Sequence, residues 1–385
     1  MSILAVQPPL DGVKPYKSLP NDELQARIQA VRDELGPRLL ILGHHYQQDE
    51  VIELADLRGD SYQLSQMAAD SSECEMIAFC GVHFMAETAD ILANRPEKLA
   101  ERDGRRVSVT LPDLAAGCSM ADMAGIAQIE DAWDQLSEVI DTERLIPVTY
   151  INSAASLKAF VGRHGGIVCT SSNARAAIEW AFDKSNGGKG GDRVMFFPDQ
   201  HLGRNTAMGM GIDEDLMPVW NPHEDDLGGN TEEALQKSKV ILWRGWCSVH
   251  QMFKAEHVEL FRKNHEGIKI LVHPECPREV FELADESGST GAIIKAVRNA
   301  PAGTKWAIGT ELHLVNRLKQ EHPEQEIHFL SPVVCMCATM YRIDLAHLCW
   351  TLENFAAGTP INTIEVDEGT AKWSLVALER MLEVK

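Results

Sequence analysis

Three cysteines occupy equivalent places in a repeated pattern of this 385-residue chain: Cys118, Cys247 and Cys337 each follow the last strand of one repeat. If the repeats are related by a pseudo-threefold arrangement, the three thiols meet at one point, where thiolates bind a metal. The chain contains no C-x-x-C pair, so the spacing typical of zinc ribbons and ferredoxins is absent. Three distant cysteines suit a cubane iron–sulfur cluster with one open iron, which acts as a Lewis acid on a substrate hydroxyl or carboxylate. A catalytic zinc with three cysteine ligands is the alternative.

The remaining cysteines have other predicted roles. Cys335 lies two residues before Cys337, and only one of the two is expected to point toward the metal. Small buried hydrophobic positions are expected for three cysteines in apolar segments: Cys74, Cys80 and Cys349. Cys169 and Cys276 lie in polar turns, where a cysteine can line a site without binding the metal.

The elements that must position these residues are strands that alternate with helices. Each repeat begins with an apolar run that predicts a buried strand and that runs directly into a polar cluster; these runs are 39–42, 146–151 and 268–272. A helical pattern and a turn of small polar residues follow each run. The second half of each repeat contains two further strands, expected at 76–79 and 107–111, at 194–197 and 240–243, and at 306–308 and 327–330.

This alternation predicts an α/β fold of three similar α/β/α domains, each a doubly wound parallel sheet. Ligands bind at the carboxyl ends of such strands, so the three sets of strand ends are expected to converge on one centre. The expected units are 1–120, 121–248 and 249–339, with long loops at 184–193 and 208–230 in the second. The C-terminal helices, within 340–385, are expected to pack on the first unit.

The charge balance excludes some functions. Thirty-six Lys and Arg against 57 Asp and Glu give a net charge of −21, which repels nucleic-acid phosphates and anionic lipids alike. Residues 1–17 lack the basic start and apolar core of a signal peptide, and no apolar run approaches the ~20 residues of a membrane-spanning helix. The nine cysteines are odd in number and widely spaced, which argues against a secreted disulfide scaffold. A reduced cytoplasmic location is therefore expected.

Taken together, the motifs resemble those of the quinolinate synthase family, iron–sulfur enzymes of de novo NAD biosynthesis. The segments that carry the resemblance occur in family order from Leu39 to about Glu353. They are Gly43-His-His-Tyr-Gln47, Gly59-Asp-Ser61, Phe79-Cys-Gly-Val-His-Phe-Met-Ala-Glu-Thr-Ala89, Ala116-Gly-Cys-Ser-Met-Ala-Asp122, Tyr150-Ile-Asn-Ser153, Cys169-Thr-Ser-Ser-Asn-Ala174, Phe197-Pro-Asp-Gln-His-Leu-Gly203, Gly245-Trp-Cys-Ser-Val-His250, His273-Pro-Glu-Cys276 and Gly309-Thr-Glu311.

The resemblance implies a triangular fold of three α/β domains around a 4Fe–4S cluster. The implied ligands are Cys118, Cys247 and one of the 335/337 pair, for which the spacing to the following helix favours Cys337. The implied reaction condenses iminoaspartate with dihydroxyacetone phosphate to quinolinate, with release of phosphate and water. A transient partner is an enzyme that oxidises L-aspartate and hands over the unstable imine.

Both implied substrates are anions, so a negatively charged chain must bind them through local hydrogen-bond donors. The predicted substrate-binding residues are His44, Tyr46, Ser61, Tyr150, Asn152, Ser171, His250, His273, Glu275, Ser289 and Thr290. Among these, Glu275, Tyr150 and His273 are the predicted catalytic residues. Glu275 is expected to act as general base with a pKa raised by burial. His83, His201 and His313 recur after the second strands and are expected, at most, to brace the site.

Two other functions compete with this interpretation. A cluster-dependent hydro-lyase of a hydroxy acid also uses an open iron. A non-catalytic metal-binding or redox-sensing protein would use the cysteines alone, but it needs no substrate donors such as Tyr150 and Glu275 around them.

Overall fold

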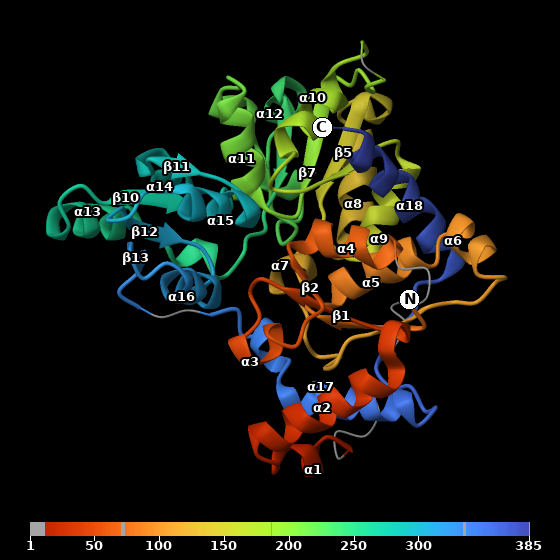
Figure 1. Ribbon diagram of the computed structural model, residues 1–385. Helices are drawn as coiled ribbons and strands as arrows, with labels where there is room; N and C mark the ends of the chain where they lie inside the picture. The colour runs from red at the N-terminus through yellow and green to blue at the C-terminus, as the bar shows by residue number, and fades with distance from the viewer. Residues whose placement is uncertain (1–11, 71–73, 186, 334–335, 385) are drawn as a thin grey trace. The chain divides into compact units, whose positions relative to one another are not determined.

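The computed structural model describes residues 12–70, 74–185, 187–333 and 336–384. The chain divides into two compact units, one formed by 1–118 with 336–367 and the other by 119–335 with 368–385. The first unit contains one sheet and the second contains two (Figure 1). Cys335 lies outside the described residues.

The sheet of the first unit has the strand order β14-β4-β3-β1-β2. Its strands are parallel except for β14, which joins the edge in the antiparallel sense. The strands are β1 (Leu39–His44), β2 (Leu57–Gly59), β3 (Met76–Cys80), β4 (Ser108–Thr110) and β14 (Thr363–Ile364). The helices of this unit are α1 (Lys14–Lys17), α2 (Asn21–Leu35), α3 (Asp49–Ile52), α4 (Ser61–Asp70), α5 (His83–Ala93), α6 (Pro96–Glu101) and α17 (Leu345–Ala356).

The second unit contains a sheet of order β6-β5-β7-β9-β8 and another of order β11-β10-β12-β13, both parallel throughout. The strands are β5 (Leu145–Tyr150), β6 (Ile167–Cys169), β7 (Arg193–Phe197), β8 (Val219–Trp220), β9 (Val240–Trp243), β10 (Lys269–Val272), β11 (Glu286–Ser287), β12 (Lys305–Gly309) and β13 (Glu326–Phe329). The helices are α7 (Ser119–Asp122), α8 (Ile126–Ser137), α9 (Ala155–Arg163), α10 (Ala174–Phe182), α11 (Gln200–Gly209), α12 (Glu232–Lys237), α13 (Ala255–Asn264), α14 (Arg278–Leu283), α15 (Thr290–Asn299), α16 (Leu312–Glu321) and α18 (Glu368–Glu383).

The three sheets share one topology. In each, the first strand of the repeat lies between the second and the third, and the last strand follows the third: β2-β1-β3-β4, β6-β5-β7-β9 and β11-β10-β12-β13. The predicted α/β class with three repeated parallel sheets is therefore confirmed. The boundaries at 120, 248 and 339 and the triangular arrangement of the three repeats stay predictions.

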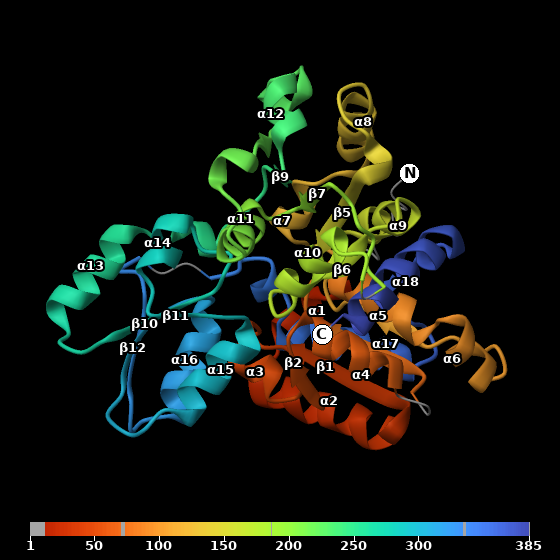
Figure 2. The same cartoon turned by 90° about the horizontal axis from the view of Figure 1, so that it is seen from above.

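Several segments differ from the expectation. The short strands β2, β6 and β11 lie at or just before the expected turns of small polar residues, and β14 adds an unexpected antiparallel strand to the edge of the first sheet. The predicted loop 208–230 contains β8, whose buried Trp220 gives the second sheet an additional edge strand. Among the C-terminal helices, α17 packs on α2 in the first unit, whereas α18 packs on α9 and β6 in the second (Figure 2). The buried side chains of α18, among them Leu378 and Met381, form the face that contacts this sheet.

Gly162 on α9 permits the close approach of α18, because a Cβ atom there would overlap the backbone carbonyl oxygen of Trp373. We expect Gly162→Ala to lower the free energy of unfolding by about 1–3 kcal/mol, since the two helices must separate to make room. Gly209→Ala is the matched control, because nothing lies within 4 Å of a Cβ at that helical position. Denaturant unfolding of both variants checks this; equal stability of the two would contradict it.

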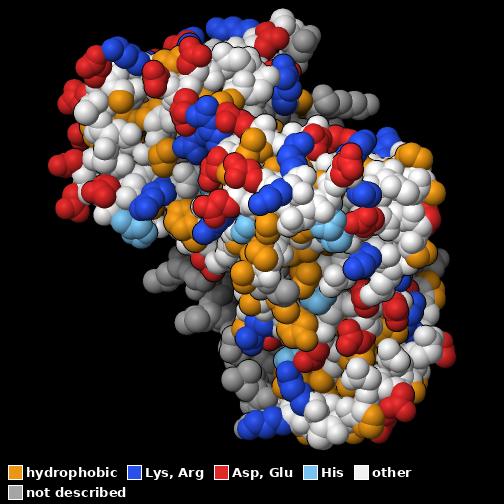
Figure 3. Space-filling model, turned by 90° about the vertical axis from the view of Figure 1, so that its left-hand side faces the viewer, with side chains coloured by type: hydrophobic (Ala, Val, Ile, Leu, Met, Phe, Trp, Pro, Cys, Tyr) orange, Lys and Arg blue, Asp and Glu red, His pale blue; other side chains and the backbone are white. Residues whose placement is uncertain are grey.

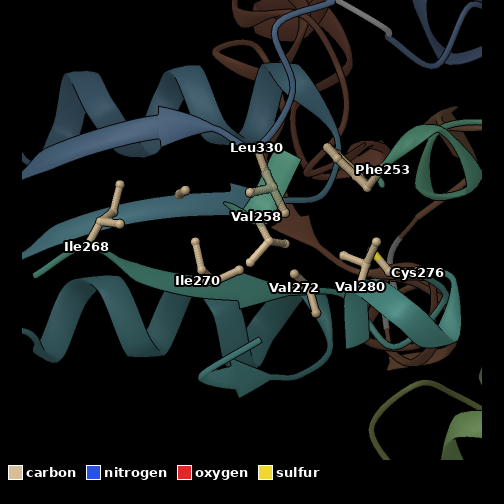
Figure 4. Packing of buried hydrophobic residues seen from close by; sticks show 9 residues of the cluster. Phe253, Val258, Ile268, Ile270, Val272, Cys276, Val280 and Leu330 are labelled. Atoms are coloured by element: carbon tan, nitrogen blue, oxygen red, sulfur yellow. The ribbon is translucent and has the colours of Figure 1, made fainter. Parts of the chain in front are cut away.

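The core of the third sheet lies between β10, β12 and the helices that cover them (Figure 4). It contains Phe253, Val258, Ile270, Val272 and Cys276, each at most 1% exposed. Cys276 anchors the turn after β10 in this core, and the turn carries the predicted catalytic Glu275.

Acidic and basic side chains are interspersed on the face drawn in Figure 3, with no continuous basic patch on that face. None of the helices in the described part of the chain is long and apolar enough to cross a membrane.

Candidate active site

Five predicted site residues of the second unit follow the carboxyl ends of its strands. Tyr150 ends β5, Cys247 and His250 follow β9, and His273 and Glu275 follow β10. All are buried except Cys247, which is partly exposed. Buried polar groups at the end of a parallel sheet are the usual composition of a ligand site in this class of fold.

Glu275 is the centre of this group and is 2% exposed. Its Oε2 lies 3.0 Å from Nδ1 of His250, and Tyr150 donates a hydrogen bond to the same carboxylate. Burial alone would raise the pKa of Glu275, but the neighbouring His273 and His250 rings and the two hydrogen bonds outweigh burial and lower it to about 2. The expectation of a raised pKa is therefore wrong. Glu275 is an ionised carboxylate that orients its two donors.

The two histidines beside Glu275 stack on each other, with ring centroids 4.5 Å apart and planes at 15°. Because ionised Glu275 only accepts, Nδ1 of His250 carries the proton, and Nε2 faces the hydroxyl of Thr310 at 3.2 Å. Burial lowers the pKa of His273 to about 3, so its ring is neutral at physiological pH. Nδ1 of His273 accepts from the backbone N–H of Glu275 at 3.4 Å, which leaves its proton on Nε2.

Cys247 adds a thiol, which is a candidate metal ligand, to this group. One ligand atom each from Cys247, His250 and Glu275 lies within 4.8 Å of the others. A thiolate is the ligand that iron–sulfur clusters and zinc prefer. The donor set at this position is therefore chemically suited to a metal centre with polar side chains beside it.

The predicted ligand cysteines differ from the other described cysteines in the solvent exposure of their side chains. Cys118, Cys247 and Cys337 are partly exposed, and Sγ of Cys337 lies 3.4 Å from the hydroxyl oxygen of Thr339. The other described cysteines are buried, namely Cys74, Cys80, Cys169, Cys276 and Cys349. Burial raises the pKa of the Cys80 thiol to about 12 and also raises those of Cys169 and Cys276, so these groups stay protonated and are poor ligands.

Helix α11 connects the two turns that carry Cys247 and Glu275. Asp199, the N-cap of α11, accepts from the backbone N–H of Leu202 at 2.7 Å and from that of Cys247 at 3.2 Å. Asn205, farther along α11, donates to the carbonyl oxygens of Pro274 and Cys276, both at 2.9 Å. Asp199 is completely buried, and burial together with the charge of Glu275 raises its pKa well above the usual value.

Sequence reasoning assigned no role to several residues that support the site. Thr310 contacts His250, and Asp199 and Asn205 hold the two turns. Lys158 is fully buried on α9, and its ammonium donates to the carbonyl of Ser153 in the turn that carries Asn152. Asp199 lies in one of the segments that carry the family resemblance, so its importance could have been predicted from the sequence. Asn205 and Lys158 lie in none of these segments, so nothing in the sequence pointed to them.

Other predicted residues of the second unit lie at the starts of helices or in turns. Ser289 caps α15 and accepts from the backbone N–H of Ala292 at 3.4 Å, and Thr290 is the first residue of that helix. Asn152 and Ser171 are half-buried in the turns after β5 and β6. His201 contacts Gln251, which is consistent with a bracing role. His313 lies in the first turn of α16, beside the capping Glu311.

The predicted residues of the first unit follow β1 and β2. His44 is 3% exposed, and its Nδ1 accepts from the backbone N–H of Tyr46 at 3.1 Å. The two rings meet edge to face, with centroids 4.7 Å apart. Ser61 is buried at the start of α4. His83 begins α5, with Nδ1 at 3.6 Å from the carboxylate of Glu87.

We expect Asn205→Ala to impair activity without removing any group of the catalytic centre. The substitution leaves the carbonyls of Pro274 and Cys276 without their donor, which costs about 1–3 kcal/mol in a buried place and loosens the turn that holds Glu275. Thermal unfolding and the kcat and KM of the variant check this. The exposed Asn299→Ala is the control; an unchanged kcat for Asn205→Ala would show that the turn holds its shape without this residue.

Comparison with known proteins identifies the chain's relatives. The family model described as Quinolinate synthetase A protein matches residues 26–383. A quinolinate synthase of Rhodopirellula baltica is 74% identical over 98% of this chain and 94% of its own length. The quinolinate synthase of Geobacillus kaustophilus is 52% identical over the full length of both chains, and that of Corynebacterium glutamicum is 53% identical over 96% of this chain and 89% of its own. The chain therefore belongs to the quinolinate synthase family of enzymes.

Proposed function

We propose that this chain condenses iminoaspartate with dihydroxyacetone phosphate to quinolinate, with release of phosphate and water. The observation that carries the proposal is the buried, ionised Glu275, which accepts hydrogen bonds from Tyr150 and His250 beside the partly exposed Cys247. This arrangement occurs in a chain that matches the family model over residues 26–383.

The proposed cofactor is a 4Fe–4S cluster held by Cys118, Cys247 and Cys337. Two observations support this ligand set: these cysteines are the partly exposed ones among those described, and the donor set around Cys247 suits a metal. When bound, a cluster with three cysteine ligands supplies an open iron that acts as a Lewis acid on substrate oxygen and nitrogen atoms.

The proposed catalytic residues hold and move protons beside this centre. Tyr150 is the candidate donor, because its hydroxyl is buried and already oriented by the Glu275 carboxylate. His250 is oriented in the same way and is supported from its other side by Thr310. Neutral His273 keeps a proton on Nε2 and is suited to donate to a substrate carboxylate or phosphate.

The anionic substrates are proposed to bind through neutral donors rather than through lysine or arginine. In the second unit these donors are Asn152, Ser171, Ser289 and Thr290. In the first unit they are His44 and Ser61, and Tyr46 supplies an aromatic face for the forming ring. Ser289 and Thr290 are buried at the start of α15, where backbone N–H groups also favour an anion.

We further propose a cytoplasmic location, because a cluster with an open iron needs a reducing compartment. An enzyme that oxidises L-aspartate is the proposed transient partner, since an imine hydrolyses in water unless it is handed over.

The test is anaerobic purification followed by spectroscopy and turnover. We expect brown protein with about four irons and four sulfides per chain, as a cubane requires, and quinolinate from the two substrates. Colourless protein that contains zinc would contradict the cluster. Brown protein that turns over hydroxy acids only would favour a hydro-lyase, and brown protein with no turnover would favour a sensor.

A further inference from the structure

A second group of metal-binding side chains lies in the third sheet, on elements other than those of the active site. His265 is the C-cap of α13, and Glu326 and His328 are on the edge strand β13. Oε1 of Glu326 lies 2.9 Å from Nδ1 of His265 and 2.8 Å from Nε2 of His328. One ligand atom of each residue lies within 4.8 Å of the others.

The strand and helix geometry brings these side chains together. Glu326 and His328 are two residues apart on β13, so both point to the same face, while Ile327 between them is buried on the other. His265 is held at the end of α13 by a hydrogen bond from its backbone N–H to the carbonyl of Phe261 at 2.9 Å. The three residues therefore converge although 61 positions separate His265 from Glu326.

Phe261 keeps the two imidazoles in place. Its ring centroid lies 5.6 Å from those of both His265 and His328, and the two histidine rings are 4.5 Å apart. Phe261 itself packs on the hydrophobic core of the third sheet. One aromatic ring that packs on the core therefore contacts both imidazoles, which favours ligands that are oriented before the metal binds.

The charge and accessibility of the group suit a cation. The side chains of His265, Glu326 and His328 are 29%, 41% and 30% exposed, so an ion can enter and water can complete its coordination. Nζ of Lys305 approaches the other carboxylate oxygen, Oε2, at 4.0 Å and leaves Oε1 to the histidines.

We propose that His265, Glu326 and His328 form a binding site for a divalent transition metal of the Zn²⁺ class, separate from the cluster. Two imidazoles and one carboxylate with open positions are a common zinc donor set. Tetrahedral zinc with bonds of about 2.0–2.1 Å spaces its ligand atoms roughly 3.3 Å apart, so the two pairs that involve Oε1 of Glu326, now 2.9 and 2.8 Å apart, need to open by only about 0.5 Å. On binding, the protons on Nδ1 of His265 and Nε2 of His328 move to the other ring nitrogens, and the freed lone pairs bind the metal. The bound metal ties the end of α13 to β13.

The test uses cluster-loaded protein, in which the three proposed ligand cysteines are occupied, dialysed anaerobically against limiting Zn²⁺. We expect His265→Ala and His328→Ala to bind one zinc per chain fewer than the parent, or to bind it at least about tenfold more weakly. His322→Ala is the matched control, because His322 also pairs with a glutamate, Glu324 at 3.2 Å, but belongs to no group of three ligands among the residues that the structure describes. We also expect Zn²⁺ to raise the melting temperature of the parent but not of His265→Ala.

Equal zinc content in the parent and both histidine variants would overturn the proposal. An equal loss in His322→Ala would overturn it as well, because it would assign the zinc to surface histidines in general. Glu326→Gln keeps the size of the side chain and separates the loss of a metal ligand from a folding defect. We expect this variant to bind zinc more weakly and to form quinolinate as the parent does.

Discussion

Cys247→Ala is expected to give colourless protein that makes no quinolinate. The proposed cluster depends on three thiolates, and loss of one leaves an iron without its protein ligand. Cys247 also lies against the Glu275 group, so its loss removes the metal from beside the proposed proton donors. Iron and sulfide content, the visible absorption spectrum and quinolinate formation measure the effect. The same result is expected for Cys118→Ala and Cys337→Ala.

Cys169→Ala is the matched control, because Cys169 is fully buried and its pKa is raised by burial. This variant should stay brown and active. Cys335→Ala should also keep the chromophore. A colourless Cys335→Ala together with a brown Cys337→Ala would reverse the ligand assignment, and a brown, active Cys247→Ala would refute the proposed cluster site.

Glu275→Gln is expected to keep the chromophore and to lower kcat/KM about a hundredfold to ten-thousandfold, because the proton donors that Glu275 orients usually contribute a factor of this size. The glutamine has nearly the same shape but no charge, and it offers one acceptor oxygen where the carboxylate offers two. Tyr150 and His250 then compete for one oxygen, and one of them loses its orientation. Steady-state kinetics beside the absorption spectrum separates this effect from cluster loss.

Glu279→Gln is the control for this substitution, since Glu279 is exposed on the neighbouring helix α14. It should leave kcat/KM and the spectrum unchanged. If Glu275→Gln retained full activity, the carboxylate would have no part in the reaction. If it lost its colour, Glu275 would support the cluster rather than the chemistry.

Much of the fold could be predicted because buried parallel strands leave long apolar runs in the sequence. The runs at 39–42, 146–151 and 268–272 are β1, β5 and β10, and the three sheets repeat one strand order. The short strands β2, β6, β8, β11 and β14 were missed, since two or three residues carry no periodicity. The position of α18 on α9 depends on Gly162, whose close contact is visible only in three dimensions.

The candidate site was predictable where a polar or ionisable residue stands at, or just after, the carboxyl end of a predicted strand. Tyr150, His250, His273 and Glu275 were found in this way, and the structure brings them together. The direction of the Glu275 pKa shift was not predictable, because the neighbouring His273 and His250 rings and two hydrogen bonds together outweigh burial, and only the folded chain brings these groups together. Asn205 was missed for a similar reason, since its partners are backbone carbonyls about 70 residues away.

The most direct test of the proposed reaction is the ratio of quinolinate to phosphate formed by anaerobic, cluster-loaded protein supplied with iminoaspartate and dihydroxyacetone phosphate. We expect the parent protein to form one quinolinate for each phosphate released, and Cys247→Ala to form neither product. Phosphate release without quinolinate, or no reaction from protein with an intact cluster, would contradict it.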